Sequence, residues 1–503
     1  MKKINISVWD KQNKEIVFAL IISAFLAFIF LLNSPLHIWR GAPSGTDSSV
    51  FKTIALMMDK GYMPYRDSFD HKGPLLYAIN YWGLKIAYYR GVWVFEFIFM
   101  TITFFMLYKI ARLKTRIFSS IVVALTAMTL LFTYFEQGNL TEEYAMPFIA
   151  IGIYIFLDYL LNNKISWYRI VISGISMGAV CLLRPNMIAV WIVFCTAIFF
   201  RKIIEKDWKQ LGQFVGWFLA GFALIVIPFI VWLIVNGALQ ACIEDYIIFN
   251  MQYTSVEGGR ASLGAKWNSF FTFVSSTIYI FALFGIVYNL KKKLFVDFTY
   301  AVYMVIGVIL LCLSGMTYGH YGMVLVPVVV YPLSLIIENI EKLSDREISK
   351  IIKMLITTYV MATIIIPQSL GTINSIPSYY SNKDNEQFDD TTKQVCEKVV
   401  ELTSEDDAIS VYGNWDIVYV KSQRKHATKY SYQFPIGQVM PEIMDEYMKQ
   451  LEEEQPPVIV VTNYDDNIQE FLEDNEYEKV WPEENGEETI DYNNIRWVYY
   501  RAQ

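Results

Sequence analysis

Acidic, basic and imidazole side chains gather in one short stretch of an otherwise apolar chain. The stretch reads YRDSFDHKGPLLY and contains Asp67, Asp70, His71 and Lys72. A carboxylate can take a proton from an attacking hydroxyl, and cations ahead of a helix can neutralise a phosphate. Asp67 and Asp70 beside a proline are also typical turn formers. The residue types therefore indicate either acid–base and phosphate chemistry or a solvated charged turn.

Pro74 marks the start of a helix directly after this stretch, because proline is favoured at the first helical position. The following residues, LLYAINYWGLKIAYY, are aromatic and amphipathic, which predicts a helix at the membrane–water interface. His71 and Lys72 then precede its N-terminus, where free amides attract anions. A lysine there opposes the helix dipole, so a bound phosphate would account for its position.

Asp47 lies at the start of another predicted helix, which ends at Gly61. Apolar residues recur at helical spacing through PSGTDSSVFKTIALMMDKG. Aspartate is a common helix cap, and a carboxylate above a membrane can also serve as a general base. Both roles remain open for Asp47.

Further polar residues lie at the ends of apolar runs. Glu142 and Glu143 in LTEEYAMPF disfavour each other's ionisation, which indicates a cation, a proton or a basic partner. They also suit the first turn of a helix. Arg184 in LLRPN either contacts a partner or substrate, or extends its side chain to the lipid headgroups. His320 and Tyr321 in TYGHYGMVLVP are either site residues or interfacial anchors.

The composition is that of a polytopic membrane protein. The chain has 503 residues, of which 54% are hydrophobic and 18% charged, and its mean hydropathy is +0.32. Apolar runs long enough to cross a bilayer recur through the first three quarters. The sequence has no basic stripe with interleaved aromatic residues, which is the pattern that would indicate nucleic-acid binding. The five cysteines have neither redox nor metal spacing, which argues against a disulfide framework or a zinc site.

About eleven membrane-spanning helices are predicted from these runs. They are Ile16–Leu32, Trp93–Tyr108, Ile117–Tyr134, Met146–Leu161, Val171–Leu183, Met187–Phe200, Phe214–Val235, Phe270–Leu290, Val296–Met316, Met323–Ile337 and Ile351–Ile366. The first run lacks a small-residue cleavage site, so we interpret it as a retained helix.

Clusters of lysine and arginine orient the chain in the membrane. They precede the first span and then occur in alternate loops, which places the N-terminus in the cytoplasm. The first loop, residues 33–92, and the later polar motifs then lie outside. An odd number of spans also places the C-terminal part outside.

The acidic tail is predicted to form a small soluble unit. AISVYG, PVIVVT and IRWVYYRA are short β-branched or aromatic runs that indicate strands, and helix-like charged stretches precede two of them. We therefore expect a polytopic α-helical transmembrane domain over residues 1–367, with the catalytic region in loop 33–92. An extracytoplasmic α/β domain is expected over residues 368–503.

The ordered motifs resemble those of bacterial membrane glycosyltransferases of the GT-C type, a group that includes protein O-mannosyltransferases and aminoarabinose transferases. The resemblance rests on GTDSSVF, DHKGPLLY, LTEEYAMPF, LLRPN and YGHYGMVLVPVV, and in the tail on VYGNWDIVYVKSQRKHATKYSYQFPI. It implies a GT-C-like fold in the bacterial cytoplasmic membrane. It also implies inverting transfer of a hexosyl or pentosyl group from a polyprenyl-phosphate donor to a hydroxyl outside that membrane.

The resemblance also assigns roles to residues. Asp47 matches the catalytic carboxylate and Lys72 the region near the donor phosphate, with Asp70 as a further catalytic candidate. Many relatives carry two prolines where this chain has Gly73–Pro74. The other candidates are His71, Arg184, His320 and Tyr321 for the donor phosphate, and Glu142 and Glu143 for the acceptor or a divalent metal ion.

Several alternatives remain open at this point. The acceptor is a cell-surface glycan, a lipid or a protein hydroxyl. A transporter or flippase of lipid-linked glycan would also need lipid and phosphate contacts. A glycan polymerase or ligase would instead use a diphosphate-linked donor. All of these functions have membrane lipid as a partner.

Overall fold

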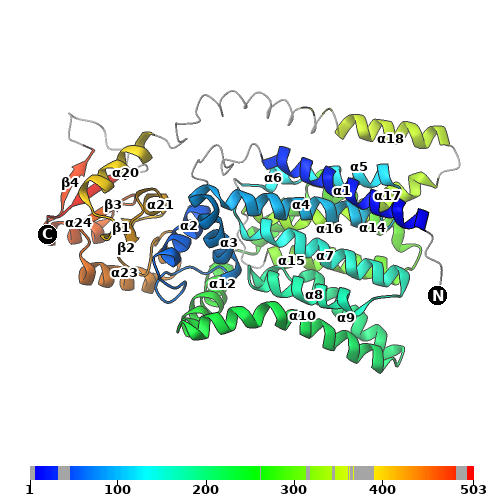
Figure 1. Ribbon diagram of the computed structural model, residues 1–503, viewed down its shortest axis with the longest axis horizontal. Helices are drawn as coiled ribbons and strands as arrows, with labels where there is room; N and C mark the ends of the chain where they lie inside the picture. The colour runs from blue at the N-terminus through cyan, green and yellow to red at the C-terminus, as the bar shows by residue number, and fades with distance from the viewer. Residues whose placement is uncertain are drawn as a thin grey trace. The chain divides into compact units, whose positions relative to one another are not determined.

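The computed structural model describes residues 6–31, 46–136, 138–260, 262–312, 318–342, 346–360, 362, 366, 390–482 and 496–502. The chain divides into two compact units, each built from separate segments and each described here by itself (Figure 1). Unit 1 comprises Met1–Ser34, Val94–Phe229 and Arg260–Tyr380, and unit 2 comprises Pro35–Trp93, Ile230–Gly259 and Ser381–Gln503.

Unit 1 is helical in the residues that the structure describes. Its α-helices are α1 (Ile6–Leu31), α4 (Val92–Ala111), α5 (Ile117–Met128), α6 (Leu131–Tyr134), α7 (Thr141–Asn162), α8 (Trp167–Cys181), α9 (Ala189–Ile204), α10 (Trp208–Val235), α13 (Leu263–Val274), α14 (Thr277–Leu290), α15 (Phe295–Leu311), α16 (Leu325–Val328), α17 (Val330–Glu341) and α18 (Arg346–Val360). Short 3₁₀ segments are η2 (Pro185–Met187) and η4 (Gly319–Val324). Each of the eleven predicted segments thus contains helix.

Fewer helices meet the length and apolarity needed to cross a bilayer unaided. Among the described residues, 5 do so, or 7 if two bent pairs each count as one span. The helices Trp167–Cys181 and Phe295–Leu311 are apolar but shorter. The structure therefore confirms a polytopic helical membrane protein, while the number eleven and the orientation stay predictions.

The segment Phe270–Leu290, expected as one helix, is bent. It consists of α13 and α14, which meet at 81°. Ser276 starts α14 by accepting a hydrogen bond on its side chain from the Tyr279 amide at 3.2 Å. A serine that caps a new helix competes with continuation of the preceding one, which explains the break.

Glycines allow α8 and α10 of unit 1 to pack closely. A Cβ on Gly174 would lie 2.1 Å from the Phe218 carbonyl oxygen, and one on Gly221 would lie 2.1 Å from that of Val171. Only 11% of the most apolar 18-residue stretch of α10 is buried, so few contacts hold this helix, and the close approach to α8 is one of them. Close backbone approach at small residues is a common way to associate helices in lipid, where apolar burial gives little drive.

We expect Gly221→Val to destabilise unit 1 by about 1–3 kcal/mol, since the new side chain meets backbone that cannot move aside. Gly216→Val is the matched control, because nothing lies within 4 Å of a Cβ there and both sites are in α10. Thermal unfolding in detergent followed by tryptophan fluorescence measures the difference. Equal melting temperatures for the two variants would contradict this account of the packing.

Unit 2 combines the first loop, a short middle segment and the C-terminal part of the chain. Its helices are α2 (Thr46–Asp59), α3 (Pro74–Ala87), η1 (Tyr88–Arg90), α11 (Leu239–Cys242), the π-helix η3 (Ile243–Ile248), α12 (Phe249–Arg260), α20 (Asp390–Leu402), α21 (Ile417–Ser422), α22 (Ile436–Val439), α23 (Pro441–Glu454) and α24 (Asp466–Asp474). Its strands are β1 (Ala408–Tyr412), β2 (Lys425–His426), β3 (Val458–Val461), β4 (Glu478–Trp481) and β5 (Trp497–Tyr500).

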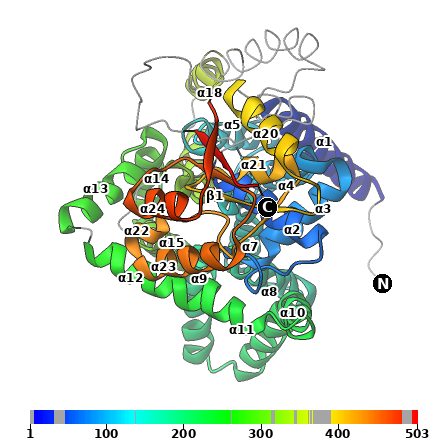
Figure 2. The same cartoon turned by 90° about the vertical axis from the view of Figure 1, so that its left-hand side faces the viewer.

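The strands form one mixed sheet in the order β2-β1-β3-β5-β4. β2, β1 and β3 are parallel, whereas β5 is antiparallel to both β3 and β4. Figure 2 shows α20 on one side of β1 and α23 and α24 on the other. The arrangement is an α/β sandwich with helices covering both faces.

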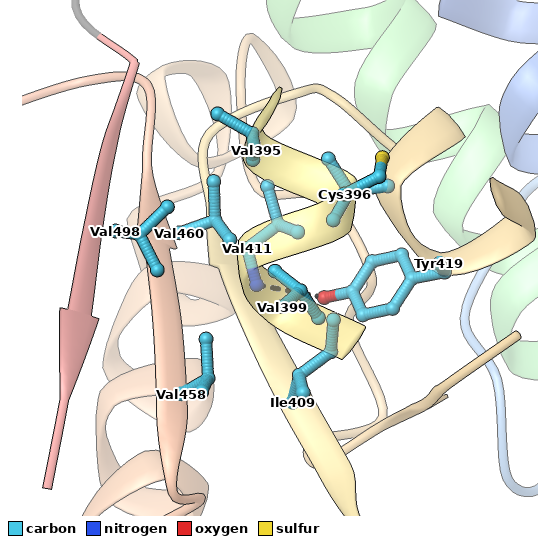
Figure 3. Close-up of a cluster of buried hydrophobic side chains, with 10 residues drawn as sticks. Val395, Cys396, Val399, Ile409, Val411, Tyr419, Val458, Val460 and Val498 are labelled. Carbon is cyan, nitrogen blue, oxygen red and sulfur yellow. Dashed lines mark hydrogen bonds between the residues drawn. The ribbon is translucent and has the colours of Figure 1, made fainter. Parts of the chain in front are cut away.

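The alternation of side chains along the central strands builds two cores. Val458 and Val460 of β3 point to a cluster with α20 and α21, in which the Tyr419 hydroxyl accepts the Val411 amide at 2.8 Å (Figure 3). Ile459 and Val461 point to the other face, against α23 and α24. A strand that is apolar at every position is expected where both faces are covered.

Several local predictions from the sequence are confirmed. The helix expected from Asp47 to Gly61 is α2, and it ends before Gly61, whose φ of +91° favours glycine. The helix expected at Pro74 is α3. The three expected strands are β1, β3 and β5. The boundary expected at residue 367 lies outside the described residues and stays a prediction.

Candidate functional site

In unit 2, the turn before α3 is organised around the carboxylate of Asp70. This side chain is 1% exposed. Its Oδ2 accepts a hydrogen bond from the Tyr77 hydroxyl at 2.8 Å. Its Oδ1 accepts one from the Tyr432 hydroxyl at 2.9 Å and another from the His71 backbone amide at 2.8 Å. A carboxylate with three donors is a well-satisfied anchor.

The side chains of His71 and Lys72 contact each other beside this anchor. Lys72 Nζ lies 2.7 Å from His71 Nε2, and His71 Nδ1 lies 3.5 Å from Asp70 Oδ1. An ammonium group has only donors, so Nε2 is the acceptor and the ring proton is on Nδ1, towards Asp70. Gly73 and Pro74 begin α3 immediately afterwards. The Lys72 ammonium group and the neutral His71 imidazole thus precede a helix N-terminus, as the sequence predicts.

Asp47 lies in the first turn of α2 and is partly exposed. Its charge acts on Tyr432: burial is the main cause that raises the pKa of the Tyr432 hydroxyl, and the charges of Asp70, Asp47 and Asp416 raise it further. Three carboxylates are therefore close enough to act on one hydroxyl. Asp416 was not anticipated from the sequence.

Asp416 is fully buried just before α21. Its Oδ2 accepts the Ser431 hydroxyl at 2.6 Å, and its backbone carbonyl accepts the Thr53 hydroxyl of α2 at 3.1 Å. Its Oδ1 makes no hydrogen bond to any residue that the structure describes. Burial raises the pKa of this carboxyl to about 7, and the nearby charge of Asp70 adds to the rise.

In unit 1, a second cluster begins with an ion pair between Glu142 and Arg184. Arg184 Nη1 lies 2.6 Å from Glu142 Oε1, and the Thr141 hydroxyl donates to Glu142 Oε2 at 2.8 Å. The Arg184 guanidinium also lies over the Tyr321 ring, 4.1 Å from its centre. Arg184 is therefore held by a carboxylate and an aromatic face.

Glu143 faces a different carboxylate from the one that the sequence suggests. The Asn139 amide donates at 2.9 Å to both Glu143 Oε2 and Glu96 Oε1. Both glutamates are completely buried. Gly138 permits this approach, because a Cβ there would lie 2.2 Å from Glu96 Oε1. The paired acids are thus Glu96 and Glu143, and Glu142 belongs to Arg184.

His320 completes the second cluster. Its Nδ1 lies 2.8 Å from Glu136 Oε2, and its ring packs edge-on against Tyr321. Neither Glu136 nor Glu96 was selected from the sequence. Glu96 gave a signal, since it is a charge within the apolar run VWVFEFIFM.

The predicted site residues are thus divided between the two units. Unit 2 holds Asp47, Asp70, His71 and Lys72, and unit 1 holds Glu142, Glu143, Arg184, His320 and Tyr321. The expected roles of these residues, and their convergence on one site, stay predictions. Among the residues that the structure describes, no group of three or more histidine, cysteine or acidic side chains could hold a metal ion.

Solved structures with a similar fold are membrane transferases. ArnT from Cupriavidus metallidurans bound to undecaprenyl phosphate matches with a TM-score of 0.63 and 12% identity, over 94% of this chain and 97% of that one. Its apo state matches with a TM-score of 0.60 and 10% identity, over 96% and 97%. The oligosaccharyltransferase AglB from Archaeoglobus fulgidus, in complex with an inhibitory peptide and a dolichol-phosphate, gives 0.53 and 11%, over 90% and 70%.

These similarities show that the chain has the fold of GT-C-type membrane glycosyltransferases, which confirms the resemblance seen in its motifs. The family described as "putative competence-induced protein Ccs4 N-terminal domain" matches residues 3–369, and the chain belongs to it. No curated protein matches the sequence.

We expect Arg184→Met to destabilise unit 1 by about 3–5 kcal/mol, because the Glu142 carboxylate would stay buried without its cation. The double variant Arg184→Met/Glu142→Gln should recover much of this loss, since no buried charge remains. Thermal unfolding in detergent compares the variants. A double variant no more stable than Arg184→Met would contradict the buried ion pair.

The raised pKa of Asp416 predicts a pH-dependent effect of Asp416→Asn. The folded state binds the Asp416 proton more tightly than the unfolded state, so this contribution to stability is lost as the pH rises through about 7. Asparagine does not titrate. Relative to wild type, the variant should therefore gain about 3 kcal/mol between pH 5 and pH 8.

The measurement is the difference in unfolding free energy between variant and wild type at each pH, which cancels the titration of other groups such as His426. Asp474→Asn, at an exposed position of α24, is the control. A constant difference between Asp416→Asn and wild type would show that Asp416 is not a buried acid with a raised pKa.

Proposed function

We propose that this protein transfers a sugar from a polyprenyl-phosphate donor to an acceptor hydroxyl on the outer face of a bacterial cytoplasmic membrane, with inversion. The acceptor hydroxyl belongs to a cell-surface glycan, a lipid or a protein. The N-terminus is placed inside and the C-terminal part outside, as the distribution of Lys and Arg predicts.

The contact between His71 and Lys72 at the start of α3 is the observation that carries this proposal. Helix N-termini and lysines both favour phosphate. The similar ArnT structure holds undecaprenyl phosphate, and the AglB structure holds a dolichol-phosphate.

The reaction needs one base and stabilisation of one leaving group. The acceptor oxygen attacks C1 of the sugar and gives its proton to Asp47, while the bond between C1 and the phosphate oxygen breaks with its electron pair leaving on phosphate. Charge grows on that phosphate in the transition state, so cations already in place lower the barrier. We assign this second role to the Lys72 ammonium group, with the His71 imidazole beside it as its hydrogen-bond acceptor.

Asp47 suits the role of base better than Asp70. The oxygens of Asp70 already accept three hydrogen bonds and the side chain is buried. Asp47 is partly exposed at the start of a helix, where a substrate could reach it. Asp70 is therefore proposed to hold the turn and not to take the proton.

We propose that some residues of unit 1 bind the sugar donor and that others act on the acceptor. Arg184, His320 and Tyr321 supply a guanidinium, an imidazole and a phenol for phosphate oxygens. Glu142 fixes Arg184, and Glu143 is retained as an acceptor or metal candidate.

A transporter of lipid-linked glycan is the second candidate function. Glu96 and Glu143 form a buried acidic pair on helices that qualify as membrane spans, and such residues are typical of ion-coupled transport. Flux of a lipid-linked glycan through sealed vesicles, without any new glycosidic product, would favour this function over transfer.

We expect Asp47→Asn to lower sugar transfer by about 10²–10⁴-fold, the usual contribution of a general base, while the protein still inserts and folds. Mass spectrometry of surface glycans, comparing a deletion strain with the strain complemented by each variant, measures the loss. Asp59→Asn, at the other end of α2 and paired with Lys85, is the matched control. Full glycan modification by Asp47→Asn would exclude Asp47 as the base.

A further inference from the structure

The backbone of the turn Asp70–Lys72 is held by side chains. The Lys72 carbonyl accepts a hydrogen bond from the Tyr65 hydroxyl at 2.8 Å. The Lys72 amide donates to the Tyr77 oxygen at 3.2 Å, and the proton of this hydroxyl is donated to Asp70. The His71 carbonyl accepts from Asn250 at 2.7 Å. With the His71 amide bound to Asp70, both peptide groups of this turn are fixed.

The groups that hold the turn come from three separate parts of the sequence within unit 2. Tyr65 and Tyr77 flank the turn, Asn250 belongs to α12, and Tyr432 belongs to the C-terminal part. Asn250 also donates to the Tyr246 carbonyl, which lies within the π-helix η3. A π-helix rotates the residues that follow it and often marks a functional position.

The ring of His71 is also fixed from the α12 side. Its centre lies 5.4 Å from that of Phe249 and 6.0 Å from that of Tyr253, with the latter ring nearly parallel. Backbone and imidazole are thus oriented by neighbours, and the imidazole in turn accepts from Lys72. Groups held in this way need no reorganisation when a charge develops beside them.

We infer that Tyr432 and Asn250 are positioning residues that preset the His71–Lys72 turn for a lipid phosphate. The inference rests on the proposed function, because it takes that phosphate as the ligand of the turn. Neither residue needs to touch the ligand. Tyr432 acts through the Asp70 carboxylate and Asn250 through the His71 carbonyl. On this view the C-terminal part of the chain helps to build the site of the first loop.

The fold alone does not distinguish a positioning role of Tyr432 from a purely structural one. The test therefore needs two measurements. Hydrogen–deuterium exchange of the peptide covering residues 69–76 reports how well the turn is held. Binding of undecaprenyl phosphate to the full-length protein in detergent reports whether the held turn matters to a lipid phosphate. Lys72→Ala gives the reference for loss of the phosphate contact.

Tyr432→Phe removes one hydroxyl and leaves the ring. Tyr430→Phe is the matched control, because the Tyr430 hydroxyl makes no hydrogen bond within the described part of the chain. We expect Tyr432→Phe to exchange about tenfold faster in the turn and to bind undecaprenyl phosphate about tenfold more weakly, as for loss of one hydrogen bond to a buried carboxylate. Tyr430→Phe should change neither value.

The outcomes separate the two proposals. Unchanged exchange in Tyr432→Phe, or faster exchange with unchanged binding, would overturn the positioning role. A wild-type protein that does not bind undecaprenyl phosphate would instead contradict the proposed function. If Tyr432→Phe does not fold, Asn250→Ala against Gln252→Ala, an exposed position of the same helix, gives the same test.

Discussion

The candidate site of unit 2 depends on the hydrogen bonds that hold the buried carboxylate of Asp70. A carboxylate removed from water costs several kcal/mol unless donors replace its hydration. Two tyrosine hydroxyls and a backbone amide do so here. Tyr77 comes from α3 and Tyr432 from the C-terminal part, so satisfying one charge ties the first loop to residues more than three hundred positions later. The turn that carries His71 and Lys72 is fixed as a consequence.

Unit 1 satisfies its buried carboxylates with an ion pair and a shared backbone amide. Its helices are apolar, and a glutamate on such a helix is tolerated only with a partner. Glu142 has Arg184, which in turn lies over Tyr321, whereas Glu96 and Glu143 share the Asn139 amide. The first arrangement presents a cation and the second a concentrated acid. They suit different ligands, which is why Arg184 is proposed to bind an anion and the pair of Glu96 and Glu143 is not.

The sequence was informative where a residue's role is local. Pro74 predicts the start of α3, and the β-branched runs predict β1, β3 and β5, because helix starts and buried strands depend on neighbours in the chain. Partners distant in sequence were missed. Nothing in NWD or YSY identifies Asp416 or Tyr432 as neighbours of Asp70, since their approach depends on how α21 and the sheet pack. Glu142 and Glu143 were expected to act on each other, but successive residues on a helix point about 100° apart and so find different partners.

The residue before Pro74 is a glycine, Gly73, which directly precedes α3. The resemblance seen in the motifs implies two prolines where this chain has Gly73–Pro74, which raises the question of how the backbone of the turn runs. Gly73 adopts φ −79° and ψ 154°, a conformation that proline also takes. It is likewise the region favoured for a residue that precedes proline. The substitution therefore removes a constraint without changing the path of the chain, and the hydrogen bonds from Tyr65, Tyr77 and Asn250 supply the rigidity that a second proline would give.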